Sequence, residues 1–384
     1  MKKICFITTS RADFGMIEVL INEALKKKNY KIYLIISGNH NDKVFGKSIK
    51  EINLSKKLKI EKIFFENKNK KEDKSTVALL FSNFLRRYTF SLKKINPNIF
   101  ISFGDRSEML AATLAAYVLK IPIAHLAGGE KTTGSLDDGY RHCMTKLSNL
   151  HFATSKEHKK RIIQLGEDSK TVFNYGSLNR QKIALTNFFS KSQLEKTFDI
   201  KFYKKNILMT LHPENIDTKN NLKNLKLVLE CLNQMKDTKI IITSPNADEG
   251  GIEMIKIIKN FIKDKKNFKY IKSFGSKGYL SVLKIVDGVI GNSSSGISEV
   301  PLFSIKSINL GNRQNGRELP SSVISCKFNK KTIIKNLYSL KRKKNNIKIK
   351  QKDKIVAKKI LKKIINFNFE KTKNKIFNDL KFIL

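Results

Sequence analysis

The sequence predicts an α/β protein made of two open parallel-sheet domains in tandem. Short β-branched runs alternate with longer stretches of helical period, a pattern that is typical of βαβ units. This alternation occurs twice, with a strand-free stretch between the two series. The chain has 384 residues, which is long for one core and fits two domains of ordinary size. Such sheets bind ligands outside the carboxyl ends of their strands, and a cleft between domains is a favoured place for a small molecule.

The first series begins at the amino terminus, where Arg11 interrupts an apolar stretch that is too short for a signal peptide. We therefore interpret this stretch as the first strand. Strands are expected at residues 3–8, 31–37, 98–102, 121–125 and 151–153. Helices are expected between them, at residues 13–27 and 106–120.

The second series opens at residue 206, after a charged helical stretch over residues 178–205. Further strands are expected at residues 239–243, 268–272, 288–291 and 305–310, with helices at 220–235 and 249–263. We predict a first domain at residues 1–185, a second at 186–350 and a basic helical segment at 351–384. An amphipathic helix at about 353–366 should pack across the domains and leave a solvated lysine-rich face.

Composition argues against several classes of protein. The net charge of +43 comes from 76 Lys and Arg against 33 Asp and Glu, but the basic residues are spread along the whole chain, which disfavours a dedicated nucleic-acid-binding protein. No apolar run approaches the roughly 20 residues of a membrane span. The four cysteines show neither zinc-site spacing nor a disulfide framework. We expect a soluble, cytoplasmic protein without membrane or nucleic-acid partners.

Polar residues follow two strands of the first series. Arg11 and Asp13 come after the first strand, where a guanidinium and backbone N–H groups could meet an anion; a surface ion pair and a helix cap are the alternatives. Asp105 ends a later strand, a location that suits a catalytic carboxylate but equally a helix cap.

The stretch from residue 121 to 142 gives the strongest signal in the first series. A buried strand runs into Gly128 and Gly129, and the glycine pair lets Glu130 approach a ligand closely. Asp137 and Asp138 follow in the same loop, where Asp137 could also cap a helix. Clustered carboxylates raise one another's pKa, which suits proton transfer near neutral pH.

The second series ends its strands with anion-binding residue types. His212 follows the strand that opens the series, and an imidazole there could contact a phosphate or assist a leaving group. The run Ser293-Ser294-Ser295-Gly296 reads as a hydroxyl-rich turn before a helix, with Glu299 available for ribose hydroxyls; a flexible serine-rich loop is the alternative. Arg313 and Arg317 follow the next strand, where they could serve a phosphate or loop packing.

These motifs, in this order, make the chain resemble the hydrolysing UDP-N-acetylglucosamine 2-epimerases of sialic-acid and related nonulosonate biosynthesis. It resembles more distantly the non-hydrolysing 2-epimerases of the same fold. The likeness covers nearly everything from residue 1 to about residue 318. It rests on Ser10-Arg11-Ala12-Asp13-Phe14-Gly15, Gly104-Asp105-Arg106, Gly128-Gly129-Glu130, Leu136-Asp137-Asp138 with Arg141-His142, Leu211-His212-Pro213, Gly291-Asn292-Ser293-Ser294-Ser295-Gly296 and Arg313-Gln314-Asn315-Gly316-Arg317.

The resemblance implies two Rossmann-like domains that face each other across a cleft, as in the GT-B glycosyltransferases. It also implies a reaction without metal or cofactor, and it is compatible with a homo-oligomer. A base removes the C2 proton of a nucleotide-linked N-acetylated amino sugar as the nucleoside diphosphate leaves C1. Water then adds to the glycal-like intermediate and gives a free mannosamine-type 2-epimer. The substrate would be UDP-N-acetylglucosamine or UDP- or GDP-linked N,N'-diacetylbacillosamine, a precursor of legionaminic acid.

The resemblance also assigns roles to residues of the cleft. Asp105, Glu130 and Asp137 become the acid/base candidates, and His212 would stabilise the departing diphosphate. The candidates for binding the nucleotide sugar are Arg11, Asp138, Ser294, Ser295, Gly296, Glu299 and Arg313.

Two departures keep other functions open. Many relatives have a polar residue in place of Ala127, and His212-Pro213-Glu214-Asn215 differs from the His-Pro-Val-Thr type of the hydrolysing enzymes. A non-hydrolysing 2-epimerase is therefore the nearest alternative, and it would return a nucleotide-linked product. A glycosyltransferase would share the architecture but needs an acceptor. A basic nucleic-acid-binding protein is the alternative from another class.

Overall fold

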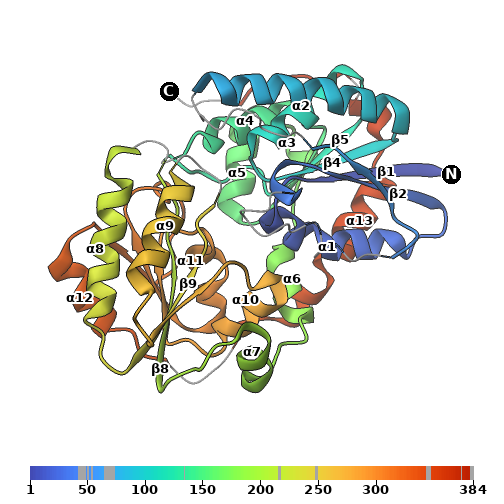
Figure 1. Ribbon diagram of the computed structural model, residues 1–384. Helices are drawn as coiled ribbons and strands as arrows, with labels where there is room; N and C mark the ends of the chain where they lie inside the picture. Colours follow the sequence, from blue (N-terminus) through green and yellow to red (C-terminus); the bar gives the residue numbers. More distant parts are fainter. Residues whose placement is uncertain are drawn as a thin grey trace.

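The computed structural model describes residues 1–41, 49, 52, 55–64, 74–133, 135–214, 218–246, 250–342, 347–372 and 374–380. Within these ranges the side chains of residues 11, 12, 39 and 74–77 are not described. The described chain forms two lobes, each a parallel sheet flanked by helices (Figure 1). We call the part built on strands β1 to β7 the first lobe and the part built on β8 to β13 the second lobe. This is the predicted α/β class with two facing Rossmann-like units of GT-B type.

The sheet of the first lobe has the order β3-β2-β1-β4-β5-β6-β7, and every pair is parallel. Its strands are β1 (Lys2–Thr8), β2 (Tyr30–Ile36), β3 (Lys59–Lys62), β4 (Ile99–Phe103), β5 (Ile123–Leu126), β6 (Leu150–Ala153) and β7 (Val172–Asn174). The chain reverses its direction of travel through the sheet between β1 and β4. Such a switch point opens a crevice at the carboxyl ends of the two strands.

The sheet of the second lobe repeats this plan with the order β10-β9-β8-β11-β12-β13, again all parallel. Its strands are β8 (Lys205–Thr210), β9 (Thr238–Thr243), β10 (Phe268–Ile271), β11 (Gly288–Gly291), β12 (Lys306–Leu310) and β13 (Val323–Cys326). The switch point here lies between β8 and β11. The two lobes therefore present equivalent strand ends.

Helices connect the strands of both lobes. In the first lobe and the connection they are α1 (Arg11–Leu25), α2 (Lys74–Ile95), α3 (Ser107–Val118), α4 (Asp137–Leu147), α5 (Lys156–Gln164), α6 (Leu178–Leu185) and α7 (Lys191–Phe198). Beyond β8 they are α8 (Asn221–Asn233), α9 (Gly251–Ile262), α10 (Gly275–Leu283), α11 (Ser295–Ser298), α12 (Lys330–Tyr338) and α13 (Val356–Asn366). The helix predicted over residues 249–263 is confirmed as α9, although residue 249 lies outside the described residues.

The first sheet is covered on both faces, which explains why its inner strands are almost continuously apolar. On β1, Ile4 and Phe6 belong to one buried cluster, together with residues of α1 and α13. Cys5 and Ile7 belong to another cluster, together with residues of α2 and α3. This alternation follows from the period of two along a strand.

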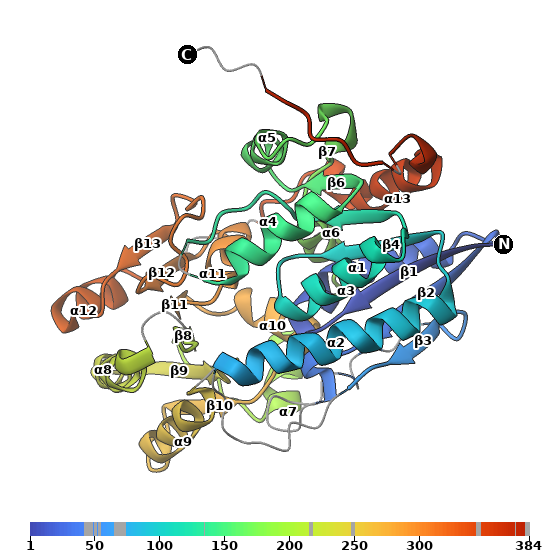
Figure 2. The same cartoon turned by 90° about the horizontal axis from the view of Figure 1, so that it is seen from above.

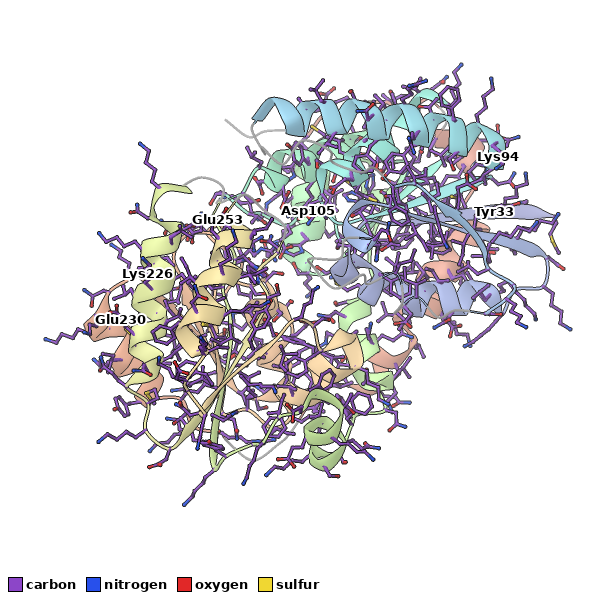
Figure 3. All side chains as sticks on the ribbon, viewed as in Figure 1. Tyr33, Lys94, Asp105, Lys226, Glu230 and Glu253 are labelled. Carbon is purple, nitrogen blue, oxygen red and sulfur yellow. The ribbon has the colours of Figure 1, made fainter. Side chains whose placement is uncertain are left out.

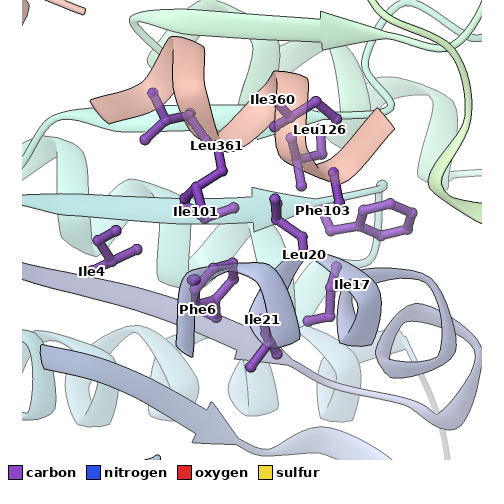
Figure 4. Packing of buried hydrophobic residues seen from close by; sticks show 14 of the residues in the cluster. Ile4, Phe6, Ile17, Leu20, Ile21, Ile101, Phe103, Leu126, Ile360 and Leu361 are labelled. Carbon is purple, nitrogen blue, oxygen red and sulfur yellow. The ribbon is translucent and has the colours of Figure 1, made fainter. Parts of the chain in front are cut away.

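The predicted amphipathic helix near the end of the chain is α13; it was expected to pack across the domains, but its buried residues complete the core of the first lobe. Its buried residues Val356, Ile360 and Leu361 share one cluster with β1, β4 and α1 (Figure 4). Seen from above, α13 lies on the side of the first lobe, far in sequence from the strands that it covers (Figure 2). The division of the chain at residues 185 and 350 stays a prediction.

The segment after α13 is also held by the first lobe. Lys375 Nζ lies 2.7 Å from Glu167 Oε2, and Lys375 donates to the backbone carbonyl of Thr145 at 3.0 Å. Glu167 is 3% exposed and is also paired with Lys146 at 2.7 Å and His151 at 2.9 Å. The end of the described chain is therefore tied to a buried carboxylate.

Most predicted strands agree with the observed ones to within one or two residues. The edge strand β3 was not predicted, because its sequence Lys-Ile-Glu-Lys is charged and mostly exposed. The short strands β7 and β13 were not predicted either. No helix in the described parts of the chain is long and apolar enough to cross a membrane.

Candidate active site

A cleft of about 780 Å³ is lined by residues from both lobes. Its walls come from the carboxyl ends of both sheets, as expected for facing Rossmann-like units. Figure 3 labels Asp105 on the side of the first lobe that faces the second. The predicted residues that line the cleft are Asp105, Glu130, Asp137, His212, Ser294, Ser295, Glu299 and Arg313.

Asp105 is placed by the turn that ends β4. Gly104 has φ 77°, a conformation that glycine adopts without strain, and its carbonyl oxygen accepts from His125 Nε2 at 3.0 Å. Burial lowers the pKa of His125 to about 3, so its ring is neutral, and Nδ1 lies 3.3 Å from Thr145 Oγ1. A buried neutral imidazole thus fixes the turn that presents Asp105.

Arg141, on α4, connects the acidic residues of the first lobe. Its side chain is only 1% exposed, and its guanidinium forms an ion pair with Asp105. It also donates to Asp138 Oδ1 at 3.2 Å and to the backbone carbonyl of Glu130 at 2.9 Å. Burial raises the pKa of Asp105, but Arg141, Arg317 and Arg106 outweigh burial and hold that pKa below its usual value. Asp105 is therefore ionised at neutral pH.

Glu130 follows the glycine pair after β5. A Cβ on Gly129 would lie 2.2 Å from the carbonyl oxygen of His158, so this position tolerates only glycine. The tight turn brings Glu130 to the cleft, where its Oε1 lies 3.2 Å from Arg317 Nη1 of the second lobe. Glu130, an acid/base candidate of the first lobe, is therefore in contact with the second lobe.

Asp137 and Asp138 begin α4 but have different positions. Asp137 lines the cleft. Asp138 accepts hydrogen bonds from the backbone N–H of Thr132 and from Arg141, and it is not among the lining residues. Neighbouring helical residues point about 100° apart, so one aspartate faces the cleft while the other supports Arg141.

His212 is oriented by its neighbours at the end of β8. Its backbone N–H donates to Asn292 Oδ1 at 2.7 Å, and Asn292 Nδ2 donates to the His212 carbonyl oxygen at 2.9 Å. The ring Nδ1 accepts from the backbone N–H of Asn246 at 2.9 Å. With Nδ1 as an acceptor, the proton of the neutral ring is on Nε2, which makes that nitrogen a donor.

The serine-rich turn after β11 combines lining and packing roles. Ser294 and Ser295 line the cleft, and Ser295 Oγ is hydrogen-bonded to the hydroxyl of Tyr279. Gly296 is not a lining residue: a Cβ there would lie 2.6 Å from Ser307 Oγ on β12, so glycine allows close packing. The structure thus gives Gly296 a packing role, and its predicted contact with the nucleotide sugar stays a prediction.

Glu299 and Arg313 complete the second wall. Burial raises the pKa of Glu299 to about 7, although Lys182 and a hydrogen bond from Asn179 oppose this rise. Arg313 Nη1 lies 3.4 Å from the carbonyl oxygen of Asn292. The backbone of Arg11 begins α1, but its side chain lies outside the described residues, so its predicted anion contact stays a prediction.

Two cationic residues of the site, Arg141 and Lys182, had no assigned role in the sequence analysis, and Arg317 was considered there only for a phosphate or for loop packing. Arg141 supports Asp105, Arg317 reaches Glu130, and Lys182 lines the cleft 3.1 Å from Glu18 Oε2. A cluster of carboxylates in a protein interior requires nearby cations. This requirement could have indicated from the sequence that cationic residues lie beside the predicted carboxylates. In the described ranges no group of three or more His, Cys, Asp or Glu is placed to hold a metal ion.

Two facing Rossmann-like lobes, with carboxylates on one wall of the cleft and an imidazole, hydroxyls and a guanidinium on the other, define an α/β enzyme of the GT-B architecture. The chain belongs to the UDP-N-acetylglucosamine 2-epimerase family, whose sequence model matches residues 23–366.

Individual relatives support this family assignment. A protein of Campylobacter jejuni named GDP/UDP-N,N'-diacetylbacillosamine 2-epimerase (hydrolyzing) is 38% identical over 332 residues, with 85% of each chain covered. The polysialic acid biosynthesis protein P7 of Escherichia coli is 32% identical, over 99% of this chain and 97% of its own. The solved UDP-GlcNAc 2-epimerase of Neisseria meningitidis bound to UDP-GlcNAc has a TM-score of 0.76 at 18% identity, over 95% of this chain and 100% of its own.

Proposed function

We propose that this chain is a hydrolysing 2-epimerase of a nucleotide-linked N-acetylated amino sugar. The substrate is a UDP- or GDP-linked N,N'-diacetylbacillosamine, or UDP-N-acetylglucosamine, and the products are the free 2-epimer and the nucleoside diphosphate. The names of the Campylobacter and Escherichia relatives support a role in sialic-acid or legionaminic-acid biosynthesis. The observation that carries the proposal is that Asp105, Glu130 and Asp137 share one cleft with His212 and Arg313.

The second lobe is suited to the leaving group. His212 Nε2–H, the hydroxyl of Ser294 and the Arg313 guanidinium line one wall and can donate to diphosphate oxygens. When the C1–O bond breaks, its electron pair passes to the diphosphate oxygen, and preorganised donors stabilise that charge. Glu299, in the same wall, is available to the ribose hydroxyls.

The first lobe is suited to proton transfer at C2. A carboxylate takes the C2 proton while the C1–O bond breaks, which leaves a double bond between C1 and C2. Water then adds its oxygen to C1 and loses a proton to a carboxylate, and C2 receives a proton on the opposite face. Asp105, ionised beside Arg141, is a base, and Glu130 and Asp137 are the other two candidates for these transfers.

Four free cysteines fit a reducing compartment, and we propose a cytoplasmic enzyme on that basis. A homo-oligomer, dimer or tetramer, stays a prediction that light scattering would check.

Proton NMR in heavy water tests the reaction directly. UDP-N-acetylglucosamine and the UDP- and GDP-linked diacetamido sugars are incubated separately with the protein, with and without EDTA. A free 2-epimer with deuterium at C2, released with nucleoside diphosphate in both conditions, supports the proposal and selects the substrate. A 2-epimer that stays linked to the nucleotide would instead favour the non-hydrolysing reaction, and loss of activity with EDTA would contradict a metal-independent one.

A further inference from the structure

Arg317 crosses from the second lobe to the acid/base residues of the first. It lies in the loop after β12, and its side chain is 12% exposed. Its Nη1 is 3.2 Å from Glu130 Oε1, a carboxylate that is 187 residues away in sequence. Its Nε is buried and has no hydrogen-bond partner among the described residues. The guanidinium is thus directed to the carboxylates of the first lobe.

The backbone of the same loop is also attached to the first lobe. The N–H of Thr133 donates to the carbonyl oxygen of Asn315 at 2.9 Å. Gly316, with φ 83°, lies against Thr133, and a Cβ there would be 3.1 Å from Thr133 Oγ1. Loop 313–317 therefore meets loop 130–133 by a hydrogen bond, a close backbone approach and an ion pair.

Several charged groups face Glu130 and Asp105. From the first lobe they are Arg106, Asp138, Arg141, His158 and Arg161, and from the second lobe Arg317 and Glu318. Arg106, Arg141 and Arg161 belong to the same lobe as the two carboxylates. Arg317, by contrast, contributes its charge only while the two loops are in contact.

We propose that Arg317 is a positioning residue that brings a positive charge from the second lobe to Glu130 and Asp105, so that these carboxylates reach their reactive arrangement only when the two lobes are in contact across the cleft. The role in catalysis rests on the proposed function. Arg317 itself lines the cleft, and in this proposal its effect is exerted through the two carboxylates. The arrangement of the proton-transfer carboxylates in the first lobe would then depend on contact with the second lobe, which holds the leaving group.

Steady-state kinetics of the full-length Arg317→Gln and Arg317→Lys variants test this role. Arg317→Gln should lower kcat by about 10- to 100-fold, the usual effect of misplaced catalytic groups, with a smaller change in KM. The acid limb of its kcat/KM profile should move to higher pH, because Asp105 loses a cation that favours its ionised form. Arg317→Lys should recover part of the rate and of the pH limb.

Arg313→Gln is the matched control. Arg313 belongs to the same loop, and its Nη1 lies 3.4 Å from the carbonyl oxygen of Asn292 in the second lobe. Its loss should raise KM and leave the acid limb in place. The proposal is overturned if Arg317→Gln leaves both kcat and the acid limb unchanged, or if Arg313→Gln moves that limb equally.

A titration without substrate separates this inference from the proposed function. Carboxyl carbon NMR follows the ionisation of Asp105 in the wild-type protein and in Arg317→Gln. A midpoint at higher pH in the variant supports the charge contact even if none of the tested sugars reacts. An unchanged midpoint overturns it even if the wild-type protein is an active epimerase.

Discussion

Replacing Asp105 with asparagine should lower kcat by about 10²- to 10⁴-fold, the usual contribution of a general acid or base. This corresponds to about 3 to 5 kcal/mol in the activation barrier. The same change also removes one carboxylate from the buried Arg141 guanidinium. A charged hydrogen bond of this kind contributes about 1.5 to 3 kcal/mol to stability. A fall in activity alone would therefore leave catalysis and folding confounded.

Asp138→Asn separates the two effects. Asp138 contacts the same Arg141, at 3.2 Å, but does not line the cleft. The variant should lose comparable stability and keep kcat within about tenfold of the wild type, because it removes a support and not a proton-transfer group. Release of nucleoside diphosphate gives kcat, and differential scanning calorimetry gives the thermal midpoint. Equal losses of kcat in the two variants would refute the assignment of Asp105 as an acid/base residue.

Three further outcomes are expected. His212→Ala should lower kcat by about 10²- to 10³-fold, the effect of losing one preorganised donor to developing charge. Rapid-quench measurement of diphosphate release would show this, and an unchanged kcat would contradict the role of His212 at the leaving group. The affinity of the protein for nucleoside diphosphate should fall as pH decreases through about 7, because Glu299 then takes up a proton and loses an acceptor. Calorimetric titration should show a weaker pH dependence for Glu299→Gln than for the wild type, and equal pH dependence in the two proteins would contradict the ribose contact. Burial raises the pKa of Glu167, but His151 and Lys375 outweigh burial and hold it at about 2, so its stabilising effect is complete above about pH 4.5 and is lost as pH falls toward 2. Glu167→Gln should therefore lower the thermal midpoint at pH 7 and show a smaller difference from wild type at pH 3, and an equal difference at both pH values would contradict the ion-pair explanation.

The fold was accessible from the sequence because the inner strands are buried on both faces. The residues of β4, for example, are all buried, and their apolar run can be recognised from the local sequence alone. The edge strand β3 lacks this signal, because a strand with one neighbour and exposed faces can be charged. The strand β3 forms by pairing with β2, and the local sequence of β3 does not reveal this pairing.

The site was accessible only in part for a related reason. Strand ends placed Asp105, Glu130 and His212 near one cleft, since parallel strands share the edge at which they end. The different positions of Asp137 and Asp138 depend on how α4 is rotated about its axis. The contact between Glu130 and Arg317 spans two lobes, and no spacing in the sequence encodes it.

The return of α13 to the first lobe has a consequence for biosynthesis of the protein. A nascent chain that has emerged through β7 has α1 but lacks α13, which shares the burial of one face of the first sheet, because Val356 and Ile360 are translated after the second lobe. The part of that face that α13 covers stays exposed on the ribosome while the second lobe is made, and exposed apolar surface attracts chaperones and aggregation. A gene cut between the lobes would likewise give an amino-terminal fragment that is soluble only when residues 356–366 are supplied as a separate peptide.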